Sequence, residues 1–331
     1  MLHFIEKITL VAVIILLLLL GVRLFLVDFS GVPMEWGVTF DRNYAAYLGL
    51  EPKAVLQAAL ADLGVDHLRL TIPWKDVEGR RDVYDWSAID WQLQEARKYN
   101  AKVILTLGRK LPRWPECYQP DWYNSLPAAQ QRTELLQMVS QSVERYQRYD
   151  NIIAWQVENE PLVGWFGDCP PPNREELKAE VALVKSLDSR PIVVTDSGEL
   201  GLWLGAAKAA DILGTTLYRV VWNDTTGFFH WPLPPAYYYY KAALVKHFTG
   251  VSQVMVTELQ AEPWSSGGMT TYPLTEQYRS MDIDQFSANL DYARRAGFDT
   301  AYLWGLEWWY WMKQTQGVES YWQTAKKLWG K

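Results

Sequence analysis

Two stretches of the sequence follow an apolar, strand-like run with a glutamate. Residues 152–161 begin Ile-Ile-Ala-Trp and reach Asn159 and Glu160 just before a proline, and residues 253–258 end in Glu258. A proline cannot continue a strand ladder, so it marks the point where strand gives way to loop. In barrel enzymes the chemistry occurs at the carboxyl ends of the strands. Two carboxyl groups brought together there could cleave a glycosidic bond, since one protonates the leaving oxygen while the other attacks or stabilises the anomeric carbon.

The rest of the chain alternates between strand-like and helix-like segments. Strands are expected at residues 35–40, 67–72, 102–107, 152–157, 191–195, 212–218, 253–258 and 300–304. Helices are expected at residues 52–63, 85–100, 128–149, 173–187, 202–210, 235–248, 283–296 and 320–328. Eight such units without a linker predict an α/β fold, a (β/α)8 TIM barrel over residues 31–331. A doubly wound sheet is the alternative, but no Gly-x-Gly-x-x-Gly motif or P-loop opens any helix.

An apolar run at residues 8–27 is interrupted only by Arg23 and follows Lys7. Its length is sufficient for one transmembrane helix, and the preceding charge favours a cytoplasmic N-terminus. We therefore expect residues 1–30 to be a signal-anchor in the lipid bilayer, with the barrel membrane-anchored and extracytoplasmic. A cleaved signal peptide is the competing interpretation. In either case the barrel is exported.

Composition narrows the classes of partner. A net charge of −6 argues against nucleic acid. The aromatic content is 14%, with 18 Trp and 19 Tyr, and flat aromatic rings suit an oligosaccharide or polysaccharide substrate as well as a core. The four histidines have no metal-ligand spacing, so we expect no metal site. We also expect no cofactor and a monomeric protein.

The two cysteines, Cys117 and Cys169, fit an exported protein. They follow the third and fourth expected strands, which are neighbours in a barrel, so the two loops rise side by side. We therefore expect a Cys117–Cys169 disulfide that fixes one wall of the cleft.

Several of these residues together resemble clan A of the glycoside hydrolases. Asn159-Glu160-Pro161 closes the fourth strand and Glu258 closes the seventh, as in that clan. Within the clan, Arg69 in Arg-Leu-Thr-Ile-Pro-Trp resembles the strand-two arginine of family 5 cellulases and mannanases. The remaining matches are Tyr218 on strand six, Trp304 on strand eight, and the Tyr84-Asp85-Trp86 helix entry. The chain departs from family 5 at two places. Gly108-Arg109 stands where the family has a histidine after strand three, and Thr216 stands where the family has a histidine on strand six.

The resemblance implies roles for these residues. Glu160 is the expected acid/base and Glu258 the expected nucleophile of a retaining β-glycosidase that acts on an extracytoplasmic glycan. Asn159 is expected to donate to the sugar 2-hydroxyl, and Arg69 and Tyr218 to hydrogen-bond Glu258.

Other residues are weaker candidates, and some alternatives stay open. Glu158 lies two residues before Glu160 and could be the acid instead, because alternate residues of a strand point to the same side. Further candidates for substrate binding or support are Trp74, Trp304, Glu262 and Glu307, together with the aromatic residues 308–311. The tyrosines at 237–240 fit a helix and are expected to pack. The alternative function is a catalytically inactive, glycan-binding barrel at the cell surface.

Overall fold

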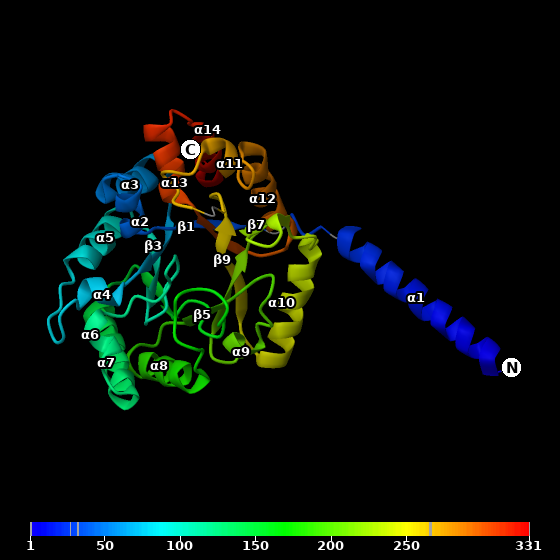
Figure 1. Cartoon of the computed structure of the whole chain (residues 1–331), viewed down its shortest axis with the longest axis horizontal. Coiled ribbons are helices and arrows are strands. Elements are labelled where there is room, and N and C mark those ends of the chain that lie inside the picture. Colours follow the sequence, from blue (N-terminus) through cyan, green and yellow to red (C-terminus); the bar gives the residue numbers. More distant parts are fainter. Residues whose placement is uncertain (1, 27, 32, 265–266, 331) are drawn as a thin grey trace.

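The computed structural model describes residues 2–26, 28–31, 33–264 and 267–330. Its centre is a closed barrel of eight parallel strands (Figure 1). The strands are β1 (Glu35–Thr39), β2 (His67–Thr71), β3 (Lys102–Leu107), β4 (Ile152–Val157), β5 (Ile192–Asp196), β6 (Ile212–Leu217), β9 (Gln253–Gln260) and β10 (Thr300–Trp304). β10 pairs with β1 and so closes the sheet. The predicted TIM barrel is confirmed, and the open doubly wound sheet is wrong.

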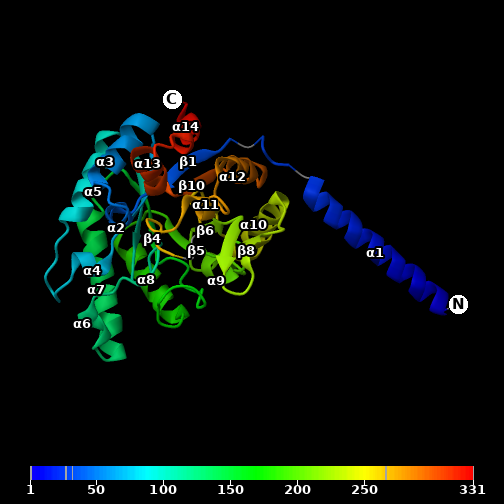
Figure 2. The same ribbon diagram turned by 45° about the horizontal axis from the view of Figure 1, so that its top comes forward.

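Helices surround the barrel (Figures 1 and 2). The longer ones are α5 (Ser87–Lys98), α7 (Ala128–Tyr146), α8 (Arg174–Leu187), α10 (Pro235–Thr249), α12 (Ile283–Arg295) and α13 (Leu306–Thr315). The shorter ones are α2 (Arg42–Tyr47), α3 (Pro52–Ala58), α4 (Trp74–Val77), α6 (Asp121–Asn124), α9 (Leu204–Ala207), α11 (Leu274–Gln277) and α14 (Ser320–Lys326). Helix α13 and a hairpin of β7 (Val220–Asn223) and β8 (Gly227–His230) were not predicted, and α9 is shorter than the helix expected there.

The barrel interior is layered, which decides where polar chemistry can occur. The lower layer is apolar and consists of Ile104, Ala154, Val193, Met255 and Tyr302. Side chains alternate along a strand, so the residues two positions later also point inward, one layer nearer the carboxyl ends. That layer contains Thr106, Gln156, Thr195, Thr257 and Trp304. The polar layer therefore lies directly beneath the mouth where the candidate glutamates are found.

A disulfide joins Cys117 to Cys169, with an S–S distance of 2.06 Å and Cα atoms 5.3 Å apart. It links the loop after β3 to the loop after β4, as predicted. Chain-entropy arguments give such a closed loop about 2–4 kcal/mol of stabilisation. The bond also fixes two loops of the barrel mouth relative to each other.

The N-terminal segment forms helix α1 (Leu2–Leu26), which projects away from the barrel in both views (Figures 1 and 2). Just after it, the ring of Phe29 stacks on Tyr239 of α10, with centroids 3.7 Å apart. The sequence predicts a membrane span over residues 8–27, of which residue 27 lies outside the described residues. Within the described part of the chain, no helix has the length and apolar character needed to cross a membrane, so that prediction is not confirmed.

Candidate active site

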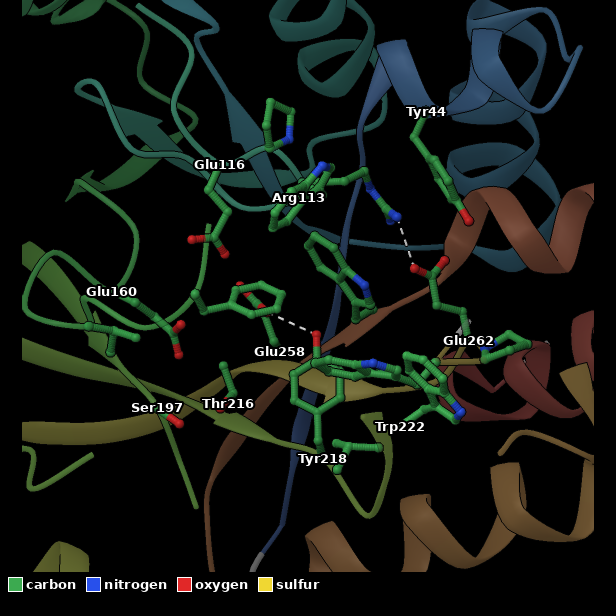
Figure 3. Close-up of a pocket in the computed structure, with 18 of the residues that line it drawn as sticks. Tyr44, Arg113, Glu116, Glu160, Ser197, Thr216, Tyr218, Trp222, Glu258 and Glu262 are labelled. Atoms are coloured by element: carbon green, nitrogen blue, oxygen red, sulfur yellow. Dashed lines mark hydrogen bonds and ion pairs between the residues drawn. The ribbon is translucent and has the colours of Figure 1, made fainter. Parts of the chain in front are cut away.

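A cavity of about 1410 Å³ lies at the carboxyl ends of the strands. Both candidate glutamates line it, and Figure 3 shows their carboxyl groups pointing into it. Its walls come from the segments after β1, β2, β3, β4, β5, β6 and β9, from the β7–β8 hairpin and from Trp304 at the end of β10. This is the face on which TIM-barrel enzymes carry their active sites.

Glu258 reaches the cavity because β9 contains a bulge. On the β6 side, Thr215 pairs with Val256 and Thr216 pairs with Glu258, so β9 has one extra residue. The pairing of β9 with β10 shifts in the same place. A bulge re-aims side chains and is common beside active sites. β9 then continues to Gln260, two residues beyond the predicted end.

Glu258 is held by a donor on each carboxyl oxygen. Nη1 of Arg69 lies 2.9 Å from its Oε1, and the Tyr218 hydroxyl lies 3.1 Å from its Oε2. Arg69 is fully buried and also donates to Gln156 at 2.7 Å and to Asn159 at 2.7 Å. The guanidinium therefore connects the polar layer of the barrel to Glu258 and Asn159. These hydrogen bonds hold the Glu258 carboxyl group in a fixed orientation.

Glu160 lies in the turn that follows β4, in a backbone conformation that is uncommon for a residue with a side chain. Its φ is 44°, and its N–H donates to the Thr195 hydroxyl at 2.7 Å. Burial raises the pKa of its carboxyl well above the ordinary value, and the negative charges of Glu258 and Glu116 raise it further. These influences favour the protonated form of the Glu160 carboxyl.

Glu158 does not line the cavity. β4 ends at Val157 and Glu158 has a φ of 61°, so the alternation that would put it on the same side as Glu160 no longer applies. Its carboxyl instead accepts the N–H groups of Arg109 at 2.8 Å and Lys110 at 2.5 Å. It ties the end of β4 to the loop after β3.

The same contact explains one departure from family 5. Gly108 has a φ of 117°, and a Cβ there would lie 2.7 Å from the Glu158 carboxyl. No larger residue, histidine included, fits at this position while Glu158 lies there. Thr216, at the other departure, accepts the Gly198 N–H at 2.8 Å and supports the loop after β5.

A second charged cluster lies on the wall of the cavity near Trp304. The guanidinium of Arg113 lies between the rings of Tyr44 and Trp304, 3.5 Å and 4.2 Å from their centroids. Its Nη1 donates to Glu262 at 2.9 Å. Trp304 and Glu262 thus line the cavity, as their predicted roles require, and Figure 3 shows the Arg113–Glu262 pair. Because Arg113 covers one face of Trp304, that face is not free for a sugar ring.

Two of the weaker predictions, Glu307 and Trp74, concern residues that the fold places behind the cavity wall. Glu307 is fully buried, accepts the Asp41 N–H at 2.6 Å and does not line the cavity. Burial raises its pKa to about 8, and the facing Arg113 opposes this. Trp74 is also fully buried and donates to Glu78 at 2.7 Å. Neither residue can contact a substrate in the cavity, so each has at most a supporting role.

The aromatic residues 308–311 belong to α13, and this helix packs them into the core. Trp308 and Trp309 are fully buried, and their indoles donate to Gln277 and to the Ala261 carbonyl. None of these residues lines the cavity. The interpretation as sugar platforms is therefore wrong, because a helix begins directly after β10.

Several lining residues were not found from the sequence. The charged ones are Asp41, Lys75, Asp76, Arg113, Glu116 and Glu199. Glu199 accepts the Tyr218 N–H at 2.7 Å. Besides Tyr44 and Tyr47 of α2, a further set of exposed or partly exposed aromatic rings lines the cavity: Trp114, Trp165, Phe166, Trp222, Phe229, Trp231 and Trp264. The members of this further set come from loops or from the β7–β8 hairpin, where no periodicity indicates the direction of a side chain. Among the described residues, no group of His, Cys, Asp and Glu side chains could hold a metal ion.

The sequence matches no known family model and no curated protein. Solved structures share its fold. A GH5_18 enzyme from Streptomyces cattleya in complex with GlcNAc has a TM-score of 0.57 at 13% identity, over 82% of this chain and 70% of that one. A GH5_18 variant from Bifidobacterium longum in complex with Manβ1-4GlcNAc has a TM-score of 0.57 at 12% identity, over 82% of this chain and 68% of that one. A cold-adapted β-galactosidase from Rahnella has a TM-score of 0.59 at 12% identity, over 90% of this chain and 56% of that one.

This chain spans little more than half the length of that β-galactosidase. At such low identity the likeness concerns the fold, and the fold is one that glycosidases of clan A have. The roles of individual residues rest on the geometry of the cavity.

Proposed function

We propose that this protein is a glycoside hydrolase of clan A that cleaves β-glycosidic bonds with retention of configuration. The observation that carries the proposal is the contrast between two buried carboxyl groups in one cavity. Glu258 receives a hydrogen bond on each oxygen from Arg69 and Tyr218, whereas burial and neighbouring negative charge raise the pKa of Glu160. Two carboxyl groups in one cavity, one oriented by two donors and one with a raised pKa, can supply a nucleophile and an acid.

In the first step, Glu160 donates its proton to the glycosidic oxygen as the bond from that oxygen to the anomeric carbon breaks. A carboxylate oxygen of Glu258 forms a bond to the same carbon, which gives a covalent glycosyl-enzyme. In the second step, Glu160 removes a proton from water, the water attacks the anomeric carbon, and the bond to Glu258 breaks. Two inversions return the original configuration.

The proposed substrate is an oligosaccharide or polysaccharide. The cavity, at about 1410 Å³, exceeds the roughly 300–1,000 Å³ of ordinary small-molecule sites, which supports a ligand of several sugar rings. The ring of Phe166, after β4, lies 5.9 Å from that of Trp264, after β9, so aromatic groups meet near the mouth. Aromatic rings offer flat apolar faces that suit sugars.

We also propose that the barrel lies outside the cytoplasm and is held at a membrane by α1. The disulfide supports an oxidising compartment. Helix α1 exposes apolar side chains such as Leu10, Leu18 and Leu19, each at least 60% exposed, which supports contact with lipid. The full chain is expected in the membrane fraction and residues 31–331 in the soluble fraction. Full-length protein in the soluble fraction would contradict the membrane attachment, and titratable thiols would contradict the oxidising compartment.

The test of the proposed mechanism separates the two glutamates. Glu258→Gln should abolish turnover of every substrate, because no covalent intermediate forms. Glu160→Ala should still react with an activated aryl glycoside, whose leaving group needs little protonation, and should accumulate glycosyl-enzyme. Azide needs no base, so it should restore turnover and yield a β-glycosyl azide.

Glu158→Ala is the matched control, because it removes a neighbouring buried carboxyl that does not line the cavity. Azide should have no effect on this variant. If azide rescues Glu158→Ala and not Glu160→Ala, Glu158 and not Glu160 is the acid/base. If the wild type turns over none of a broad panel of aryl glycosides and polysaccharides but binds glycans, the inactive binding barrel becomes the better account.

A further inference from the structure

A third buried carboxyl group in the cavity has no role in the mechanism above. Glu116 is 3% exposed and lines the cavity. It lies in the loop after β3, directly before Cys117 of the disulfide. Figure 3 shows the carboxyl groups of Glu116 and Glu160 both directed into the cavity, and the charge of Glu116 acts on the Glu160 carboxyl. The loop therefore places Glu116 next to the proposed acid/base.

Lys110 connects these two glutamates. Its ammonium group lies 3.1 Å from the Glu116 carboxyl and donates to the backbone carbonyl of Glu160 at 3.1 Å and to that of Val163 at 3.0 Å. Two of its three N–H groups donate to these backbone carbonyls, and its contact with Glu116 is an ion pair. Its own backbone carbonyl accepts the Asn159 N–H at 2.7 Å. Lys110 thus contacts the turn after β4 at Asn159, Glu160 and Val163.

These contacts bear on a residue whose backbone needs support. Glu160 has a φ of 44°, a left-handed conformation that is unfavourable for a residue with a Cβ. Such conformations persist where the surroundings hold them in place. The Thr195 hydroxyl accepts the N–H of Glu160, and the Lys110 ammonium donates to its carbonyl oxygen. Both sides of the residue are therefore fixed.

Charge at this site acts on the Glu160 carboxyl from several elements. Glu258 on β9, Glu116 after β3 and Asp196 on β5 raise its pKa, and Lys110 lowers it. Burial raises the pKa of Glu116 itself to about 7, against the opposing charge of Lys110. As Glu116 loses its proton, it adds a negative charge beside a carboxyl that must remain protonated for the first step.

We propose that Lys110 and Glu116 are positioning residues for Glu160: Lys110 fixes the backbone turn that aims its carboxyl, and Glu116 places a negative charge beside it. This inference rests on the proposed function, since it assigns the pair to the acid/base. Lys110 holds Glu116 close to Glu160, while Glu116 compensates the positive charge that Lys110 brings into the cavity.

The pH profile of kcat/KM tests the part that Glu116 plays. In Glu116→Gln, the charge that opposes ionisation of Glu160 is absent, so the pKa of Glu160 falls. The alkaline limb of the profile should move to lower pH by roughly one unit, the effect of removing one neighbouring charge. At a pH above the new limb, hydrolysis of an unactivated glycoside should fall more than hydrolysis of an activated aryl glycoside. A merely structural role for Glu116 predicts neither change.

Asp76→Asn is the matched control, because Asp76 also lines the cavity but forms its contacts with Arg42 and Asn43. Its alkaline limb should stay at the wild-type pH. An unmoved limb in Glu116→Gln, in an enzyme that folds and is active, would overturn the role of Glu116. An equal shift in Asp76→Asn would show that only the total charge of the cavity matters.

Substitution of Lys110 tests the positioning part. Lys110→Met should lower kcat on an unactivated glycoside by at least tenfold with a smaller change in KM, and Lys110→Arg should recover part of the loss. If Lys110→Met does not fold, Lys110→Arg decides, since its geometry differs while its charge remains. Wild-type kcat in Lys110→Met would overturn this part. Azide rescue of Glu160→Ala tests the catalytic assignment separately, so failure of the inference and failure of the function are distinguishable.

Discussion

Glu258 and Glu160 are held by different parts of the fold. Glu258 is carried by a strand, and its partner Arg69 lies inside the barrel with no exposure to solvent. Glu160 lies in a turn, and its partners Lys110 and Glu116 come from the loop after β3. That loop is in turn joined to the loop after β4 by the disulfide. The proposed nucleophile is therefore held by the barrel, and the proposed acid by two loops that are covalently linked.

The difference has a physical reason. A proposed nucleophile needs a fixed orientation, and the buried Arg69 on β2 provides it without movement. A proposed acid must be protonated first and ionised later, so its surroundings need opposing charges close by. Loops can bring several charged groups together at one point, whereas strands offer only every second residue. Changes to the two regions should therefore affect stability and catalysis in different proportions.

The largest effect is expected for Arg69→Leu. It leaves the Glu258 carboxylate buried without its cation, so unfolding free energy should fall by about 3–5 kcal/mol. Activity should fall by at least ~10²-fold, because Glu258 loses its orientation. Denaturant titration and kcat/KM measure the two. Arg145→Met is the control, since its pair with Asp90 is partly exposed, at 33% and 24%, and should be worth less than about 1 kcal/mol. Similar stability losses in the two variants would contradict the importance assigned to burial.

The disulfide variant Cys117→Ser/Cys169→Ser should have an intermediate effect. Loss of the link should lower the unfolding free energy by about 2–4 kcal/mol. Because Glu116 adjoins Cys117, hydrolysis of an unactivated glycoside should suffer more than that of an activated aryl glycoside, which needs little acid assistance. Kinetics on the two substrates in parallel measure this. Equal losses of activity on the two substrates would show that the linked loops do not position Glu160 in particular.

Tyr218→Phe should have the smallest effect of the three. It removes one hydrogen bond to Glu258 and leaves the ion pair with Arg69, so the unfolding free energy should change by about 1 kcal/mol. A loss of similar size in the transition state corresponds to a several-fold fall in kcat. Steady-state kinetics and thermal unfolding measure both. A loss as large as that of Arg69→Leu would mean that Tyr218 acts directly on the substrate.

The same division decides what the sequence could predict. Strand periodicity and the position of Pro161 gave the barrel and both glutamates at the mouth, and Arg69 and Tyr218 lie beside Glu258 as expected. Cys117 and Cys169 could be paired because neighbouring strands have neighbouring loops.

The positions of residues in loops and turns could not be predicted in this way. Strand alternation left Glu158 open as an alternative acid, but β4 ends at Val157 and the backbone at Glu158 is left-handed, so the alternation does not extend to it. Glu116 and Lys110 meet Glu160 only because the loop after β3 folds over the turn after β4. Trp308 and Trp309 face the core because α13 follows β10 at once. No local pattern in the sequence encodes these three arrangements.

Identification of the residue that carries the sugar tests the central claim most directly. Glu160→Ala should be incubated with an activated aryl glycoside that wild type hydrolyses, quenched, digested and analysed by mass spectrometry. We predict one glycosyl group, attached to the peptide that contains Glu258, and none in the Glu258→Gln variant. A sugar attached to Glu116, Glu199 or Glu262 would contradict the assignment of the nucleophile. Absence of any adduct, with a product of inverted configuration from the wild type, would contradict the retaining mechanism itself.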